Sequence, residues 1–209
     1  MDLFSAIFQI AIVMFSVVVH EVAHGVAADK LGDPTARYQG RLTLNPIPHL
    51  DPFGSIFLPL LLTLSGSPFL LGWAKPVPYN PFNFRRGGKW GEAIVAFAGP
   101  ASNFLIALVM ALLIRAELFP PEMTAVLFLV LFINVLLGIF NLIPIPPLDG
   151  SKVLSALLPS AMQRAYDVWR TQLEHNPFLG FGIIIVFILV AGSAFGNLIY
   201  TVSRLLGGV

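Results

Sequence analysis

Two histidines and a glutamate lie close together near the end of the chain's first long apolar run, in the stretch VVVHEVAHGVAAD from Val17 to Asp29. His20, Glu21 and His24 fit the pattern H-E-x-x-H. On a helix, residues i and i+4 share a face, so both imidazoles could bind one metal ion. Glu21 would lie on the adjoining side, where it could activate a water molecule at that ion. Ionisable residues inside a membrane span are costly, so this stretch predicts a functional site.

Two histidines do not complete a catalytic zinc site, which usually has three protein ligands and an open position for water. The sequence has no cysteine, so a third ligand must be His, Asp, Glu or Asn. Asp149 is the most suggestive candidate because it follows NLIPIPPL, whose prolines prevent a regular helix. Irregular backbone at membrane depth is tolerated only where it is buried or lines a cavity. The other candidates are His49, Asp51 and His175, the last of which we expect to face water in a polar loop over Arg170–Asn176.

Composition places the chain in a membrane. Of its 209 residues, 56% are hydrophobic and only 11% are charged, and the mean hydropathy is +0.83. Ordinary soluble domains carry about 25% charged residues. The net charge of +1 gives no reason to expect a nucleic-acid partner, and the absence of cysteine excludes a disulfide framework. The length favours one domain over residues 1–209.

Long apolar runs predict an all-α integral membrane protein with about four to five spanning helices. No basic residue precedes the first run, so we interpret it as a retained transmembrane segment and not as a signal peptide. The predicted spans are Leu3–Ala28, Ala93–Ile114, Thr124–Ile143 and Phe178–Leu198, the last with a possible extension to Leu206.

A fifth apolar stretch, Pro52–Trp73, is interrupted by several glycines and prolines. Positive charge in Tyr79–Trp90 and after Ile143, and only acidic charge in Ala116–Met123, place the first two regions in the cytoplasm and the third outside. His20 and Asp149 can then share a depth near the cytoplasmic side only if Pro52–Trp73 enters and leaves by the same face. We therefore expect a re-entrant segment there.

The H-E-x-x-H pattern together with N-L-I-P-I-P-P-L-D-G, Asn141–Gly150, resembles the site-2 protease family of intramembrane zinc metalloproteases of the M50 type. The likeness is to the short prokaryotic form without a PDZ domain. Three further stretches agree with it: N-P-I-P-H-L-D-P at Asn45–Pro52, G-W-A-K-P-V-P-Y-N-P at Gly72–Pro81 and G-P-A-S-N at Gly99–Asn103.

The resemblance implies one Zn²⁺ per chain, with His20, His24 and Asp149 as ligands and Glu21 as the catalytic carboxylate. It also implies that Asn141 positions the substrate or the developing oxyanion. The expected substrate is a transmembrane or membrane-proximal segment of a membrane protein. The expected location is the lipid bilayer of a prokaryotic cytoplasmic membrane, in a multi-pass arrangement with the active site towards the cytoplasm. The oligomeric state is left open.

Several residues allow two interpretations. His49 and Asp51 could bind the metal or orient its ligands, although a structural role in a loop is the simpler reading. Asn103 could take part in catalysis or join two helices. Pro144, Pro146 and Pro147 could leave backbone groups free to meet an extended substrate.

Two further alternatives concern the chain's fold and its activity. Tyr38–Leu44 could form a short β-strand that offers an edge to the substrate, or an ordinary loop. A membrane zinc carrier or inactive scaffold would use the same metal ligands but would not need Glu21. The presence of Glu21 in register favours the enzyme.

Overall fold

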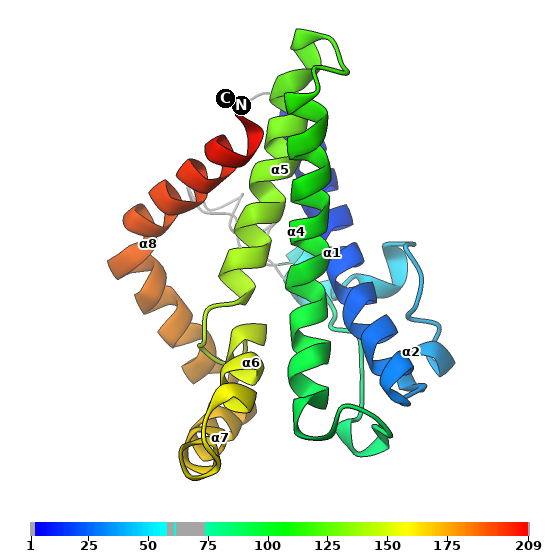
Figure 1. Cartoon of the computed structure of the whole chain (residues 1–209), viewed down its shortest axis with the longest axis vertical. Coiled ribbons are helices and arrows are strands. Elements are labelled where there is room, and N and C mark those ends of the chain that lie inside the picture. Colours follow the sequence, from blue (N-terminus) through cyan, green and yellow to red (C-terminus); the bar gives the residue numbers. More distant parts are fainter. Residues whose placement is uncertain (1–2, 58–60, 62–73, 209) are drawn as a thin grey trace. The chain divides into compact units, whose positions relative to one another are not determined.

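The computed structural model describes residues 3–57, 61 and 74–208, and the regular elements within them are all helical (Figure 1). Four of the described helices are long and apolar enough to cross a membrane. This confirms the prediction of an all-α membrane protein with four of its predicted spans. The four are Ile7–Leu31, Gly88–Arg115, Pro121–Asn141 and Phe178–Gly207. The chain forms two compact units, Met1–Arg86 and Gly87–Val209.

The first unit is built around the long helix α1, Leu3–Leu31. The helix ends just before Gly32 and Asp33-Pro34, because a residue that precedes proline disfavours the helical conformation. Short helical turns follow: α2 (Thr35–Tyr38), the 3-10 turn η1 (Ile47–His49), the π-helical η2 (Pro52–Phe57) and the 3-10 turn η3 (Pro81–Asn83).

Asp33, just after the end of α1, binds the segment around residues 80–83 near the end of this unit. Its buried carboxylate accepts hydrogen bonds from the Thr35 hydroxyl (2.5 Å), the Asn83 side-chain amide (2.7 Å) and the Asn80 backbone N–H (2.6 Å). Burial alone would raise the pKa of Asp33, but these hydrogen bonds outweigh it and hold the pKa below its usual value. The segment around residues 80–86 is therefore fixed next to α1, where the N–H groups of Arg85 and Arg86 also reach the Leu31 carbonyl.

Two predictions for this unit have different outcomes. The possible β-strand over Tyr38–Leu44 is wrong, because Tyr38 ends α2 and residues 39–44 form turns and bends that continue into η1. The alternative, an ordinary loop, holds. The re-entrant segment was expected over Pro52–Trp73, of which only η2 and Leu61 belong to the described residues, so it stays a prediction.

The second unit begins with the 3-10 turn η4 (Gly88–Trp90) and an antiparallel pair, α4 (Gly91–Arg115) and α5 (Pro121–Asn141). Small side chains on α4, at Ala107 and Ala111, let Leu131 and Val135 of α5 pack closely against it. Ile199 of α8 (Pro177–Gly207) completes this apolar core. Figure 1 shows α4 and α5 side by side over most of their length.

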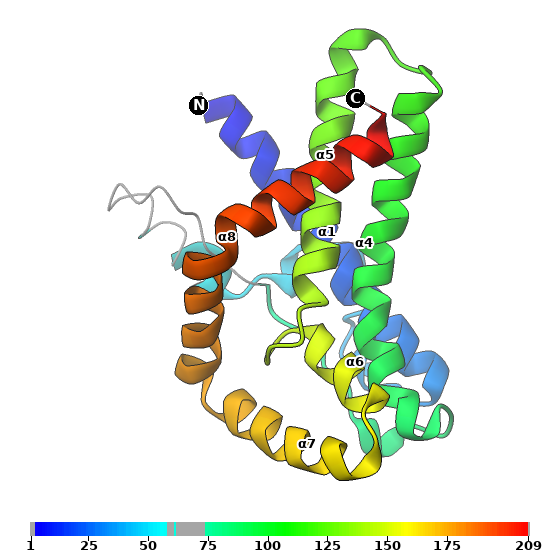
Figure 2. The same cartoon turned by 60° about the vertical axis from the view of Figure 1, so that its left-hand side comes forward.

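Two shorter helices, α6 (Asp149–Leu157) and α7 (Ser160–His175), connect α5 to α8. The expected irregular backbone is present, because turns and bends run from Leu142 to Leu148 before α6 begins. The polar loop expected over Arg170–Asn176 is wrong, since α7 continues to His175, which is nevertheless exposed as expected. In Figure 2, α7 lies crosswise to α4 and α5.

Candidate metal centre

His20, Glu21 and His24 lie together on α1 and are the group of metal-ligating side chains found among the described residues. One possible ligand atom from each side chain lies within 4.8 Å of the other two. Both histidines are buried, and their ring centroids are 4.6 Å apart with the rings nearly perpendicular. The structure therefore brings together the three side chains that the H-E-x-x-H spacing predicts.

The donor set fits a zinc ion. Zinc in proteins is bound by imidazole nitrogen and carboxylate oxygen, and H-E-x-x-H helices supply two imidazoles from one face. His20 and His24 are one helical turn apart on such a helix, within a segment apolar enough to span a membrane. Buried imidazoles in such a segment are better explained by a metal than by packing alone.

Glu21 is held by the backbone of a distant segment. One oxygen of its carboxylate, Oε2, accepts a hydrogen bond of 2.7 Å from the N–H of Val77. Val77 is buried and lies in the stretch A-K-P-V-P-Y-N, residues 74–80, which has no regular secondary structure. The bond fixes the direction of the carboxylate and occupies one of its two oxygens.

Two residues hold this segment in place. The guanidinium of buried Arg41 donates to the carbonyls of Lys75 (2.7 Å) and Pro76 (3.3 Å). The N–H of Lys75 donates to the carbonyl of His49 at 2.8 Å. The position of Glu21 therefore depends, through Val77, on Arg41 and on the turn at His49.

Gly25, directly after His24, lets this segment come close to α1. A Cβ atom at Gly25 would lie 2.6 Å from a side-chain carbon of Leu42 and 2.8 Å from one of Val77. Contacts this short would force these side chains, or the loop that carries them, to move. Glycine at this position thus allows the segment that bonds Glu21 to pack against the helix that carries the histidines.

His49 and Asp51 are not part of the His20–Glu21–His24 group. The ring nitrogen Nε2 of buried His49 lies 2.9 Å from the Thr43 carbonyl, a local contact within the loop. Asp51 Oδ1 accepts from the N–H groups of Phe53 (3.0 Å) and Gly54 (2.6 Å) at the start of η2. Both contacts support the structural interpretation of these residues.

Asp149 belongs to the second unit, where it is the first residue of α6. The following Gly150 allows an unusually close approach, because a Cβ there would lie 2.1 Å from the Leu142 carbonyl oxygen. The D-G pair therefore ends the proline-rich turns and starts a helix in a space that excludes any larger residue than glycine. As a zinc ligand, Asp149 stays a prediction.

The other predicted residues also lie in the second unit. The Asn141 amide donates to the Leu137 carbonyl of its own helix at 2.9 Å. The Pro144 carbonyl accepts from the Tyr166 hydroxyl at 3.1 Å, and Pro147 lies close to Gly180 of α8. Asn103 donates to Asn134 across the α4–α5 pair at 2.9 Å, which favours the helix-packing interpretation of Asn103.

Sequence reasoning missed Arg41, Val77 and Asn134. The Arg41 side chain binds backbone carbonyls and Val77 donates its backbone N–H, and contacts with backbone groups leave no pattern of side-chain types. Val77 lies in the stretch G-W-A-K-P-V-P-Y-N-P, which carries part of the family resemblance but by itself indicates no role for Val77. Asn134 carried a usable signal, because it is a polar residue in the middle of an apolar span.

Comparison with known proteins points to one family. The profile of "Peptidase family M50" matches residues 116–187, which include Asp149. The chain is 38% identical over 187 residues to the protein named "Putative zinc metalloprotease YwhC" of Bacillus subtilis, an alignment that covers 85% of this chain and 78% of that protein. No solved structure matches the chain.

Two further relatives carry similar names. The chain is 32% identical over 155 residues to "Putative zinc metalloprotease Rip2" of Mycolicibacterium smegmatis, which covers 73% of this chain and 58% of that relative. It thus spans little more than half the length of Rip2. It is also 39% identical over 72 residues to "Zinc metalloprotease MJ0392" of Methanocaldococcus jannaschii, or 34% of this chain and 21% of that one.

Proposed function

Because this chain belongs to peptidase family M50, we propose that it is an intramembrane zinc endopeptidase. Its substrates are transmembrane or membrane-proximal segments of other membrane proteins. The observation that carries the proposal is the His20–Glu21–His24 group, whose ligand atoms lie within 4.8 Å of one another on a helix that is apolar enough to span a membrane.

His20 and His24 hold the zinc ion in this proposal, and Asp149 supplies the third ligand. The two units that carry these residues would then form one catalytic domain. Bound zinc acts as a Lewis acid that polarises the scissile carbonyl and makes water more acidic. This chemistry explains why a hydrolytic site can work inside a membrane.

Glu21 is the general base and acid. One of its oxygens accepts from the Val77 N–H, and the other takes the proton from the attacking water. The same carboxylate then delivers that proton to the amine that leaves when the peptide bond breaks. The bond to Val77 favours this role because it restricts the carboxylate before the substrate arrives.

The substrate must be extended where it is cut, since a regular helix hides its carbonyls in internal hydrogen bonds. The turns over residues 142–148 offer irregular backbone for this purpose, and Asn141 lies at their start. The distribution of Lys and Arg in the loops favours a site towards the cytoplasmic side of the cytoplasmic membrane.

The zinc content of the detergent-purified protein tests the proposal without a known substrate. We expect about one zinc per chain in the wild type, as for sites with one set of three protein ligands. The Asp149→Ala and His24→Ala variants should both lose it, whereas His175→Ala, which changes an exposed histidine at the end of α7, should retain it.

The possible outcomes separate the parts of the proposal. Loss of zinc in Asp149→Ala and His24→Ala together would support one site shared by the two units. Full zinc in Asp149→Ala, with loss in His24→Ala, would remove Asp149 from the site. If the wild type bound no zinc after metal was supplied, the proposal of a zinc protease would be contradicted.

A further inference from the structure

Helix α7 has a polar and an apolar face, and they are arranged in the opposite way to those of a helix on a soluble protein. A helix at the surface of a soluble domain turns its apolar side inward and its charged side to water. In α7, Arg170 and Asp167 contact other helices of the second unit, whereas several large apolar side chains are exposed together with Arg164.

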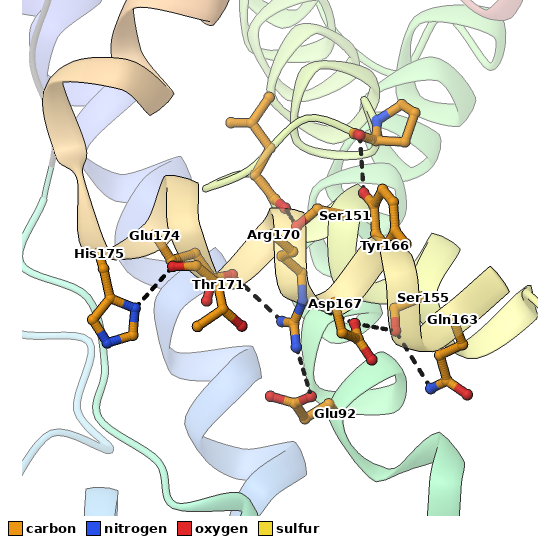
Figure 3. A network of polar contacts seen from close by, with 12 residues as sticks. Glu92, Ser151, Ser155, Gln163, Tyr166, Asp167, Arg170, Thr171, Glu174 and His175 are labelled. Carbon is orange, nitrogen blue, oxygen red and sulfur yellow. Dashed lines mark hydrogen bonds and ion pairs between the residues drawn. The ribbon is translucent and has the colours of Figure 1, made fainter. Parts of the chain in front are cut away.

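The polar face of α7 is bound to two other helices (Figure 3). Arg170 lies between three carboxylates, with nitrogen–oxygen distances of 3.4 Å to Glu92 of α4 and 3.3 Å and 3.4 Å to Asp167 and Glu174 of its own helix. Asp167 also accepts from the Ser155 hydroxyl of α6 at 2.7 Å. The positive charge of Arg170 is therefore compensated within the protein.

Several large apolar side chains of α7 are exposed, although the Trp169 ring also contacts the Tyr166 ring of the same helix. Met162 is 59% exposed, Val168 61% and Trp169 39%. At about 100° per residue, Met162 and Trp169 lie on the side of the helix away from Asp167 and Glu174, and Val168 lies at the edge of that side. Large apolar side chains that gather on one side of a helix usually mark a surface that contacts a partner or a membrane.

The attachments of α7 place it at one end of the spanning helices. The Tyr166 hydroxyl reaches the Pro144 carbonyl, just after the end of α5. Arg170 reaches Glu92, in the first turn of α4. Asn176 alone separates α7 from α8.

The start of α4, the end of α5 and the start of α8 must lie on the same side of the bilayer if all three helices cross it. A helix tied to all three ends therefore lies near the membrane surface. Its crosswise direction in Figure 2 agrees with a helix that runs along that surface.

We propose that α7 lies in the membrane–water interface, with Met162, Val168 and Trp169 in contact with lipid. Amphipathic helices of this kind bury an apolar face about 5–10 Å into the boundary between headgroups and acyl chains. Tryptophan is enriched at that depth. The partner of this surface is the bilayer itself. The surface is continuous with exposed apolar side chains at the start of the adjoining α8, such as Phe178 and Leu179.

Spin labels on opposite faces of α7 test this proposal. The chain has no cysteine, so Met162→Cys and Thr171→Cys each give one labelling site. Both positions are exposed, and nine residues place them about 180° apart on a helix. The labelled proteins are reconstituted into phosphatidylcholine vesicles, and collisions with oxygen and with a water-soluble nickel chelate are measured.

The label at position 162 should show a ratio of oxygen to nickel collisions roughly tenfold higher than the label at 171, because its face is in lipid. Equal access of nickel to both labels would show α7 standing in water. Shielding of the label at 162 from both reagents would show that protein, such as a second copy of the chain, covers this face. Either result would overturn the proposal.

A second measurement uses the native tryptophan. In protein that carries Trp73→Phe and Trp90→Phe, Trp169 is the remaining tryptophan. Its emission should be quenched by lipids brominated near the headgroup more than by lipids brominated near the chain end. Quenching by aqueous iodide, with none by brominated lipid, would contradict the lipid contact even if a labelled variant failed to fold.

Discussion

Arg41 in the first unit and Arg170 in the second are both largely buried, yet they bind different kinds of partner. Arg41 donates to two backbone carbonyls, of Lys75 and Pro76. Arg170 lies between three carboxylates. Burial would lower the pKa of Arg170, but these carboxylates raise it above its usual value.

The difference between the partners suggests a difference in task. Carbonyl groups are fixed along a chain, so an arginine bound to two of them determines the path of that chain. In the first unit this path leads to the Val77 N–H and so to Glu21. Carboxylates mainly compensate charge, and in the second unit they let a charged helix face pack against protein while its apolar face stays exposed.

The largest effect is expected from substitution of Glu21, the proposed catalytic residue of the first unit. Under the proposed function, Glu21→Gln should lower the rate of peptide cleavage about 10²–10⁴-fold, because the amide cannot take up a proton. Zinc content should not change, and the amide oxygen can still accept from Val77. Cleavage of a membrane substrate is compared with that of His24→Ala, which should lose zinc as well. Full activity of Glu21→Gln would show that another group is the base.

Arg41→Ala tests whether Arg41 acts on Glu21 through the segment at residues 74–80, because it removes the side chain that binds this segment and leaves Glu21 itself intact. A small misplacement of a catalytic group can cost about 10²-fold. We expect kcat to fall roughly 10- to 100-fold on this ground, with KM and zinc content little changed. Arg41→Lys, which keeps one charged donor, should recover part of the loss. A loss of zinc in parallel with activity would instead assign Arg41 to the support of the whole unit.

Both units contain parts that the sequence predicts and parts that it does not. The spans follow from long apolar runs, and the His20–Glu21–His24 group follows from its spacing on a helix, since both depend on neighbours in the chain. The turns before Asp149 follow from the prolines for the same reason. These parts were predicted with nearly the right boundaries.

Contacts between distant segments were not predictable in this way. The bond between Val77 and Glu21 depends on the fold of the loop and on a backbone N–H, which every residue except proline has. The end of α7 was predicted to be a loop because its polar residues suggest exposure to water, whereas Arg170 and Asp167 of this helix bind Glu92 and Ser155 of other helices. The polar partners that orient Glu21 and that bind α7 to other helices are each more than ten residues away in the chain.

A smaller effect is expected at Asp33, which ties the first unit together through neutral donors. Asp33→Asn should lower the free energy of unfolding by about 1–3 kcal/mol, because buried donors of Asn80 and Asn83 lose a charged acceptor. The folded pKa of Asp33 lies below its unfolded value, so the wild type has this stability above pH ~4 and loses it as the pH falls further.

The measurement for Asp33 is thermal unfolding in detergent between neutral and acidic pH. The difference between wild type and Asp33→Asn should be largest at neutral pH and should narrow at the acidic end. A difference that did not depend on pH would show that the carboxylate charge of Asp33 contributes nothing to the fold.

The smallest effect is expected at the carboxylates around Arg170, where a matched pair of variants is available. Glu92 and Glu174 both lie 3.4 Å from Arg170, and their side chains are 37% and 31% exposed. Partly exposed ion pairs contribute up to about 1 kcal/mol, so neither Glu92→Gln nor Glu174→Gln should change the overall unfolding temperature much.

The two variants should differ in the local stability of α7, because Glu92 joins α7 to α4 whereas Glu174 belongs to α7 itself. Amide hydrogen exchange in α7 should therefore become faster in Glu92→Gln than in Glu174→Gln. Equal exchange in the two variants would mean that α7 is held by Ser155, Tyr166 and the bilayer without help from α4. In that case the carboxylates that matter for Arg170 would be those of α7 itself, whereas the partners of Arg41 belong to a distant segment of the chain.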